Sequence, residues 1–188
     1  MEKIKIINRL IHERKSVFPQ NYINKAIPED ILMQILKNAD RAPTHKLTEP
    51  WRFKIIKGKK RKELGIFLSK KYKETAIDFN EKKYNKLKSN PEKADVIIII
   101  SMIRDPMKQI PEWEEIASVA MAVQNMHLTC TAYDIGAYWS TPGMINYMKE
   151  FTEQEENEKC LGFFYMGYYD KELLISKRKP LEQKIKYL

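Results

Sequence analysis

The sequence predicts a single α+β or α/β domain in which helices and short strands pack in layers around one core. Three observations predict this class. Amphipathic helical patterns alternate with short apolar runs along the 188 residues. Residues 95–102 form an apolar, β-branched run that is typical of a central strand buried on both faces. Residues 112–133 are apolar around most of a helical circumference, which indicates a helix in the core or at a subunit interface.

The N-terminal half of the sequence predicts three helices, one strand and a polar stretch. Ile4, Ile7 and Leu10 recur at helical spacing near the N-terminus. A second helix opens at Pro28, whose ring suits a first turn, and must end before Pro43. The predicted elements are helices over residues 2–13, 28–41 and 59–73, a strand over 51–57, and a Lys-rich stretch over 74–90 with helical character, which Pro91 ends.

The C-terminal half predicts three strands, one long helix and two short ones. Pro142 and Gly143 lie in a loop that ends the predicted strand over residues 136–139. Thr152 and Glu155 have the spacing of a capping box, which predicts a short helix beginning there. The other predicted elements are strands over residues 95–102, 136–139 and 160–169, and helices over 112–133 and 144–150.

The last segment, residues 171–188, is basic, has sparse apolar residues and is too short to fold alone. We therefore predict that it forms an arm laid over a partner. No internal repeat, low-complexity tract or linker interrupts the chain. Residues 1–188 are accordingly predicted to form one domain.

Composition predicts a cytoplasmic globular protein. Hydrophobic residues make up 43% of the chain, yet no apolar run approaches the roughly 20 residues that span a bilayer. The N-terminal residues lack the apolar core of a signal peptide. Cys130 and Cys160 have no metal-ligand spacing, and we expect both to be buried as small hydrophobic side chains.

The net charge of +9 lies in one region of the sequence. Residues 54–93 hold 14 Lys/Arg against 5 Asp/Glu, so the remaining residues balance at 20 against 20. A nucleic-acid surface is one interpretation of this excess. Aromatic residues are sparse in the region and no nucleic-acid motif is present, so a solvated, Lys-rich helical face is favoured and no nucleic-acid partner is expected.

Several classes of site are disfavoured by the motifs that the sequence lacks. The six glycines fit neither the dinucleotide-binding fingerprint nor the phosphate-binding loop of nucleotide hydrolases. His12, His45 and His127 are far apart, and no zinc motif is present, so no metal is expected. The sequence also lacks the nucleophile elbow of hydrolases. Any catalysis is therefore expected to use an organic cofactor.

Four segments, in order and at suitable spacing, carry a resemblance that covers nearly the whole chain. Residues 41–53 read Arg-Ala-Pro-Thr and, after a gap, Glu-Pro-Trp-Arg-Phe. Residues 14–16 read Arg-Lys-Ser, and residues 136–141 read Gly-Ala-Tyr-Trp-Ser-Thr. Residues 178–182 read Arg-Lys-Pro-Leu-Glu. Together they resemble the nitroreductase family of FMN enzymes.

The short-chain branch of that family gives the closest pattern, through His45-Lys46 and through Trp113-Glu114 before the long helix. The resemblance implies an α+β, nitroreductase-like fold with a central, mostly antiparallel sheet flanked by helices. It also implies an intertwined homodimer with two FMN molecules at the subunit interface, and residues 171–188 as a C-terminal arm on the partner subunit.

The activity that the resemblance implies is FMN-dependent oxidoreduction. Hydride passes from NAD(P)H to flavin N5 and on to a small-molecule acceptor such as a nitroaromatic or a quinone, in a ping-pong sequence. No side chain is expected to act as an acid or base. The implied cofactor-binding residues are Arg14, Lys15, Ser16, Arg41, His45, Trp139, Ser140, Thr141 and Arg178.

The chemistry of these residues agrees with the roles that the resemblance implies. The cations Arg14, Lys15 and Arg178 suit the FMN phosphate and ribityl end, and Ser16 offers a hydroxyl there. Residues 139–141 would lie along the isoalloxazine ring. The other subunit would supply Arg41 and His45.

Two positions depart from the family pattern. Many relatives have Asn where Leu47 stands and Gln where Glu49 stands. Leu47 offers no hydrogen bond to the flavin ring, and a carboxylate at position 49 would be unfavourable beside the ring once it has gained negative charge. These departures keep a second hypothesis open, namely a flavin-binding storage or redox-sensing protein without nitroreductase turnover.

Overall fold

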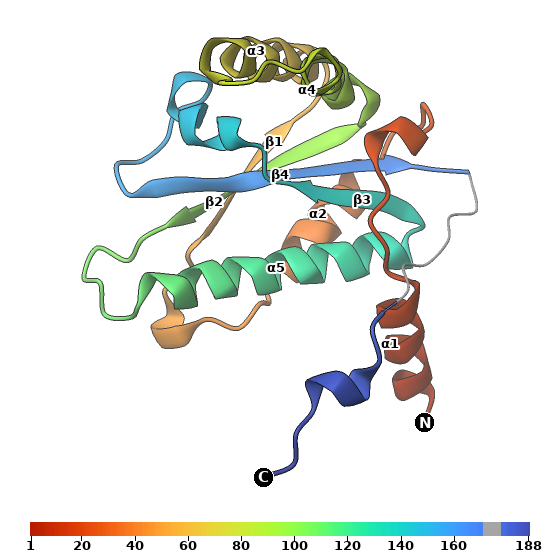
Figure 1. Cartoon of the computed structure of the whole chain (residues 1–188). Coiled ribbons are helices and arrows are strands. Elements are labelled where there is room, and N and C mark those ends of the chain that lie inside the picture. The colour runs from red at the N-terminus through yellow and green to blue at the C-terminus, as the bar shows by residue number, and fades with distance from the viewer. Residues whose placement is uncertain (171–177) are drawn as a thin grey trace.

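A four-stranded sheet forms the centre of the chain in the computed structural model, which describes residues 1–170 and 178–188 (Figure 1). The strand order is β1-β2-β4-β3, and every neighbouring pair is antiparallel. The strands are β1 Trp51–Ile56, β2 Val96–Ile103, β3 Ile135–Ser140 and β4 Glu158–Tyr168. Of the two predicted classes, the antiparallel pairing supports α+β.

The β2 strand confirms the prediction of a strand buried on both faces. Because side chains alternate along a strand, Ile98 and Ile100 pack into one apolar cluster, whereas Ile97 and Ile99 pack into the other. All four are at most 1% exposed. The sheet therefore separates two cores, and each core needs its own helical layer.

Helices cover both faces of the sheet, as Figure 1 shows. One layer consists of α2 (Glu29–Ala39) and α5 (Glu112–Ala132). The opposite layer consists of α3 (Lys59–Thr75) and α4 (Glu81–Lys93), together with the 3-10 segment η3 (Gly143–Glu150). The remaining elements are α1 Glu2–Glu13, and the short 3-10 segments η1 Pro19–Asn21, η2 His45–Leu47 and η4 Leu181–Lys184.

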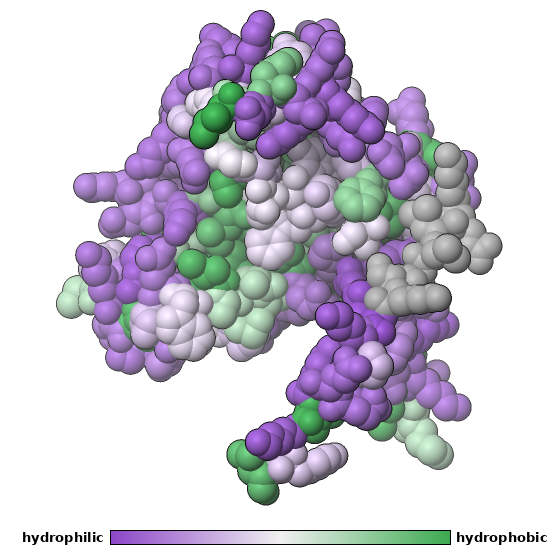
Figure 2. Space-filling view, viewed as in Figure 1, coloured by the Kyte–Doolittle hydropathy of each residue, from purple (hydrophilic) through white to green (hydrophobic). Residues whose placement is uncertain are grey.

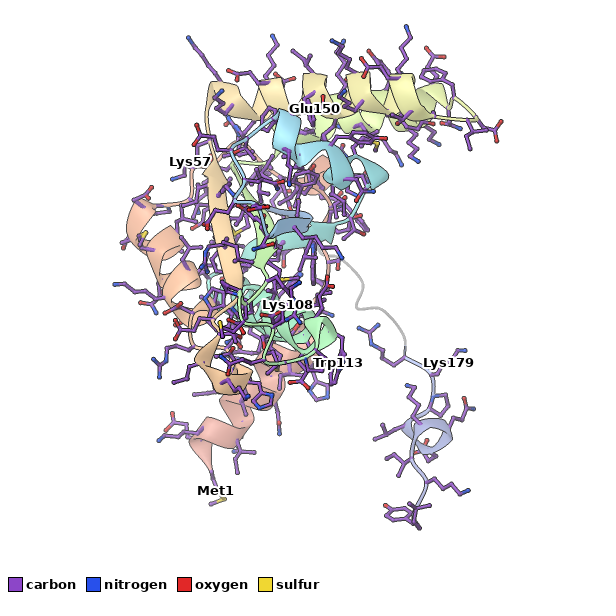
Figure 3. All side chains as sticks on the ribbon, turned by 90° about the vertical axis from the view of Figure 1, so that its left-hand side faces the viewer. Met1, Lys57, Lys108, Trp113, Glu150 and Lys179 are labelled. Atoms are coloured by element: carbon purple, nitrogen blue, oxygen red, sulfur yellow. The ribbon has the colours of Figure 1, made fainter. Side chains whose placement is uncertain are left out.

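Two terminal segments project from this layered body. Helix α1 buries none of its residues, and Ile4 and Ile11 are at least half exposed. Residues 178–188 are all exposed and stand away from the sheet, on the side where Figure 3 labels Lys179. The predicted arm begins at residue 171, and its first part, residues 171–177, falls outside the described residues.

Two predictions about short segments are wrong. No helix begins at Thr152, because residues 152–157 are irregular, and the Glu155 N–H donates to the Glu158 carboxylate at 3.2 Å. Pro91 does not end the Lys-rich stretch, since α4 continues through it to Lys93. A proline in the last turn removes one hydrogen bond without affecting the rest of the helix.

Cys130 and Cys160 are both free and buried, as predicted. Burial raises the pKa of the Cys160 thiol to about 11, and it raises that of Cys130 further. Both thiols therefore remain protonated and unreactive near neutral pH. Among the helices of the described residues, none is both long and apolar enough to cross a membrane.

Candidate functional site

The segment that follows α1 forms one wall of the candidate site by pairing with the edge strand β3. Ser16 and Ala137 form a parallel bridge, and the Val17 N–H donates to the Ala137 carbonyl at 2.9 Å. A glycine at 136 makes this approach possible, because a Cβ there would lie 2.8 Å from the Val17 Cβ. The pairing holds residues 14–16 at the sheet edge.

The other end of β3 carries the second group of predicted site residues. Ser140 is the last residue of the strand, where the sequence had predicted a loop, and Thr141 follows it as an exposed residue. The Trp139 indole N–H donates to the Leu161 carbonyl at 3.2 Å. Trp139 thus fastens β3 to β4, and its ring joins the core on the α5 face.

The structure therefore brings together two of the four sequence segments, residues 14–16 and 139–141, along one strand. A cavity of about 290 Å³ lies on the α4 side of this edge, where Tyr138 and Ser140 of β3 line it. Its lining includes aromatic, basic and polar side chains, among them Phe18, Gln20, Lys83, Lys86, Tyr138 and Ser140. We call this cavity the β3-edge cavity.

Lys83 and Lys86, which were not predicted as site residues, lie one turn apart on the face of α4 toward the cavity. Leu87 and Asn90 continue that lining face. The Lys83 ammonium lies 4.8 Å from the centroid of the Tyr72 ring. The spacing 83, 86, 87 and 90 was the available signal, but in a Lys-rich stretch it equally suits a solvated face.

Arg14 lies at the C-terminal end of α1, on the α5 side of the same edge. Its charge acts on His127, whose pKa falls to about 4 because of burial first and of Arg14 second. The imidazole is therefore neutral at physiological pH and contacts the Phe164 ring edge-on at 4.8 Å. Arg14 remains a half-buried cation that a neutral neighbour does not repel.

Arg41 follows α2, where its N–H donates to the Asn38 carbonyl at 3.2 Å and its side chain is exposed, and His45 lies further along the loop. His45 Nδ1 pairs with Glu114 Oε2 at 2.6 Å, at the first turn of α5. Arg14 acts on His127, 13 residues further along that helix, which corresponds to about 20 Å at 1.5 Å per residue. A single chain therefore does not bring His45 to Arg14.

The loop that contains His45 is held in an uncommon backbone conformation. Lys46 and Leu47 have φ of 52°, and Glu49 has φ of 41°, which non-glycine residues rarely adopt. Thr44 fixes the loop, because its Oγ1 lies 3.1 Å from Thr48 Oγ1 and accepts from the Glu49 N–H at 3.2 Å. Leu47 is thereby held outward and is 80% exposed.

A second, more apolar cavity of about 390 Å³ lies beside this loop, lined by Thr44, His45, Trp113 and Met121 among others. Trp113 points outward from the first turn of α5 and is 67% exposed (Figure 3). Arg178, the remaining predicted site residue, is exposed in the segment 178–188, which Figure 3 shows apart from α1.

A larger cavity of about 460 Å³ lies at the opposite edge of the sheet, and the buried carboxylate in its lining, that of Glu158, already has a partner. Lys54 forms an ion pair with Glu158, whose side chain is only 2% exposed. Burial alone would raise the pKa of the Glu158 carboxyl, but its hydrogen bond from Lys54 keeps that pKa below its usual value. We interpret this cluster as structural.

Removing the Lys54 ammonium tests that interpretation. Lys54→Met should lower the free energy of unfolding by roughly 1–3 kcal/mol, because it leaves a buried carboxylate without its cation. Since the folded pKa of Glu158 is depressed, wild-type stability should be present at neutral pH and fall under acidic conditions; the variant should lose less. Urea unfolding at pH 7 and pH 4 measures both effects.

Lys57→Met is the matched control, because the Lys57–Glu29 pair at 2.6 Å is exposed on both sides. Its effect should stay below about 1 kcal/mol. Equal losses in the two variants would contradict the structural role of the buried pair.

No group of three or more His, Cys, Asp or Glu side chains within residues 1–170 and 178–188 could hold a metal ion. At the β3 edge, the side chains around the cavity include lysines and aromatic residues. Such a set suits an anionic, aromatic ligand.

Comparison with known proteins gives the family. The family model described as Nitroreductase family matches residues 11–168, which contain every strand and all of the β3 edge. The chain belongs to the nitroreductase family, a family of oxidoreductase enzymes. The resemblance of residues 14–16, 41–53 and 136–141 is thereby confirmed at the level of the family.

Two curated relatives carry the provisional name NAD(P)H nitroreductase. YdjA of Escherichia coli (strain K12) is 28% identical over 138 residues, covering 72% of this chain and 74% of the relative. YfhC of Bacillus subtilis (strain 168) is 25% identical over 183 residues, covering 95% of this chain and 92% of the relative.

Solved structures share the nitroreductase-like fold. A nitroreductase-like protein from Bacillus cereus has a TM-score of 0.79 at 26% identity, covering 97% of this chain and 95% of its own. An FMN complex from Desulfovibrio desulfuricans has a TM-score of 0.74 at 21% identity, with 95% and 94% coverage. The FMN-dependent nitroreductase NfnB from Mycobacterium smegmatis, in complex with NADPH, has a TM-score of 0.78 at 17% identity, with 98% and 99% coverage.

Proposed function

We propose that this protein is an FMN-dependent NAD(P)H oxidoreductase that reduces small acceptors such as nitroaromatics or quinones. The observation that carries the proposal is the β3 edge, where Arg14 to Ser16 and Ser140 lie along one strand beside a cavity with two lysines. Bound FMN would supply the redox chemistry, taking hydride at N5 from NAD(P)H and passing it to an acceptor in a second half-reaction.

The residues at this edge fit FMN in charge and shape. Arg14 and Lys15 offer cations for a phosphate dianion, and Ser16 offers a hydroxyl beside them. At the other end, the aromatic lining of the β3-edge cavity suits a flat ring system. Lys83 would place positive charge near the polar edge of that ring, where charge accumulates on reduction.

We further propose that the functional unit is an intertwined homodimer. The exposed apolar face of α1, with Ile4 and Ile11, and the exposed Leu181 and Ile185 of the projecting segment suit burial against a second copy. A second copy could also supply Arg41 and His45; within one chain, His45 contacts α5 about 20 Å along the helix from His127, on which Arg14 acts. Arg178 would reach a phosphate site only if the projecting segment folds onto a subunit.

The alternative function is flavin storage or redox sensing without turnover. It rests on Leu47 and Glu49, which stand in the fixed loop beside the apolar cavity. Leu47 adds apolar surface there instead of a hydrogen-bonding group. The two functions share a flavin and differ in whether NAD(P)H is oxidised.

Purified protein is expected to be yellow, to release FMN on heating, and to oxidise NADH or NADPH when a nitroaromatic or quinone acceptor is present. Absorbance spectra, identification of the released flavin and steady-state rates at 340 nm measure this, and light scattering on the same sample should give the mass of a dimer. A protein that holds FMN but leaves both dinucleotides unoxidised would support the storage or sensing alternative. A colourless protein that cannot be loaded with FMN would overturn both.

A further inference from the structure

The basic excess of residues 54–93 becomes one outer layer of the folded chain. These residues form the end of β1 and then α3 and α4, which lie together on one face of the sheet (Figure 1). Hydrophilic side chains cover that layer in the space-filling view (Figure 2). The rest of the chain is balanced at 20 Lys/Arg against 20 Asp/Glu, so residues 54–93 account for the net charge of +9, and most of their lysines lie on this face.

Ion pairs neutralise part of the charge of α3, which has seven Lys/Arg against two Glu, whereas α4 has five Lys against two Glu. On α3, Lys60 pairs with Glu63 at 2.6 Å, and Lys71 pairs with Glu150 at 2.6 Å. Within the described part of the chain, no carboxylate forms an ion pair with a lysine of α4. The α4 lysines are Lys82, Lys83, Lys86, Lys88 and Lys93.

Two of these lysines are arranged to act together at the rim of the β3-edge cavity. Lys86 lines the cavity, and Lys82 lies four residues earlier, which places both on one side of α4. Lys83 differs from them, because its ammonium lies over the Tyr72 ring. Lys82 and Lys86 therefore form a pair of exposed cations on the outer side of the rim, next to the opening where a reductant would enter.

We propose that Lys86, supported by Lys82, makes this enzyme prefer NADPH to NADH by attracting the 2′-phosphate. The inference rests on the proposed function, because it takes the β3-edge cavity as the place where the nicotinamide meets the flavin. The adenosine end of the dinucleotide must then extend over the rim. NADPH differs from NADH there by one phosphate of about −1.5 to −2 charge, for which a cationic rim discriminates.

The first test compares the ratio of kcat/KM for NADPH to kcat/KM for NADH. The wild-type ratio should exceed one, and Lys86→Gln should lower it by roughly 3- to 10-fold, with a smaller decrease for Lys82→Gln. Because exposed charges are screened, salt should lower kcat/KM for NADPH more steeply than for NADH. A general effect on folding or flavin loading would change kcat/KM for NADPH and for NADH by the same factor, so the ratio would stay unchanged.

The matched control is Lys37→Gln, an exposed lysine of α2 on the opposite face of the sheet, which should leave the ratio unchanged. A second readout needs no turnover: by calorimetry, adenosine 2′,5′-bisphosphate should bind wild-type protein more tightly than adenosine 5′-monophosphate. Lys86→Gln should remove most of that difference.

An active FMN protein with a ratio of one or below, or with a ratio that Lys86→Gln and Lys37→Gln leave equally unchanged, overturns this inference and leaves the proposed function intact. A protein that oxidises neither dinucleotide overturns the proposed function and this inference together.

Discussion

Arg14→Ala should weaken FMN retention by about 10- to 100-fold, because one charge-assisted contact to a phosphate contributes roughly 1.5–3 kcal/mol. Arg14 lies where α1 ends, and the Ser16 bridge to Ala137 fixes the backbone next to it at the sheet edge. In the variant, the phosphate would lose this contact and keep those offered by Lys15 and the Ser16 hydroxyl. Fluorescence titration of deflavinated protein with FMN measures the dissociation constant.

Arg9→Ala is the control, since Arg9 is an exposed arginine on the same helix and is not part of the proposed site. Its dissociation constant for FMN should match that of the wild type. Arg14→Lys should restore part of the affinity, because it keeps the charge and loses the bidentate geometry. Equal FMN affinity in Arg14→Ala and wild type would refute the phosphate assignment.

Gly162→Ala should lower the free energy of unfolding by roughly 2–5 kcal/mol, with a decrease in Tm on the order of 10 °C. Gly162 has φ of 137°, a conformation that alanine adopts only with strain. An added Cβ would lie 2.5 Å from both the Ser140 carbonyl oxygen and Trp139 Nε1. The methyl group would therefore push the end of β3 away from β4.

This substitution should also impair the site, because Ser140 lines the β3-edge cavity. Gly143→Ala provides the control: no atom lies within 4 Å of a Cβ at that position, and its φ is not positive. Thermal unfolding of both variants, with FMN content measured on the same samples, separates the two effects. If Gly162→Ala were as stable as Gly143→Ala, the contact of the added methyl group with Ser140 and Trp139 would not lower the free energy of unfolding.

The residue pattern alone predicted most of the helices and strands, because buried faces require apolar residues at regular spacing in the sequence. The β-branched run of β2 could be identified because the strand is enclosed by protein, and the apolar circumference of α5 because most of that helix is buried or half-buried, although Met121 is 39% exposed. Helix α4 gave a weaker trace, because only Pro91 is buried in it and Tyr84 and Leu87 are the apolar residues that pack inward. The capping-box prediction at Thr152 failed for a related reason: the residues that follow are mostly acidic and provide no apolar stripe to bury.

The candidate site was predicted in part, and only through the resemblance. Arg14 and Ser140 are separated by more than one hundred residues, and strand pairing brings their segments to one edge. The role of Lys83 and Lys86 could not be predicted, because a lysine that lines a cavity and a lysine in solvent give the same sequence pattern. That His45 would pair with Glu114 was likewise invisible until α5 and the loop were placed together.

The pairing of residues 16 and 17 with Ala137 also protects the sheet from other chains. Strand β3 is an edge strand, and unpaired N–H and C=O groups at such an edge are a template for intermolecular pairing. Val17 occupies part of that edge with its own backbone hydrogen bond to Ala137. Proteolytic loss of the N-terminal segment would therefore remove Arg14 and at the same time expose an aggregation-prone strand, so a clipped sample should lose its colour and its solubility together.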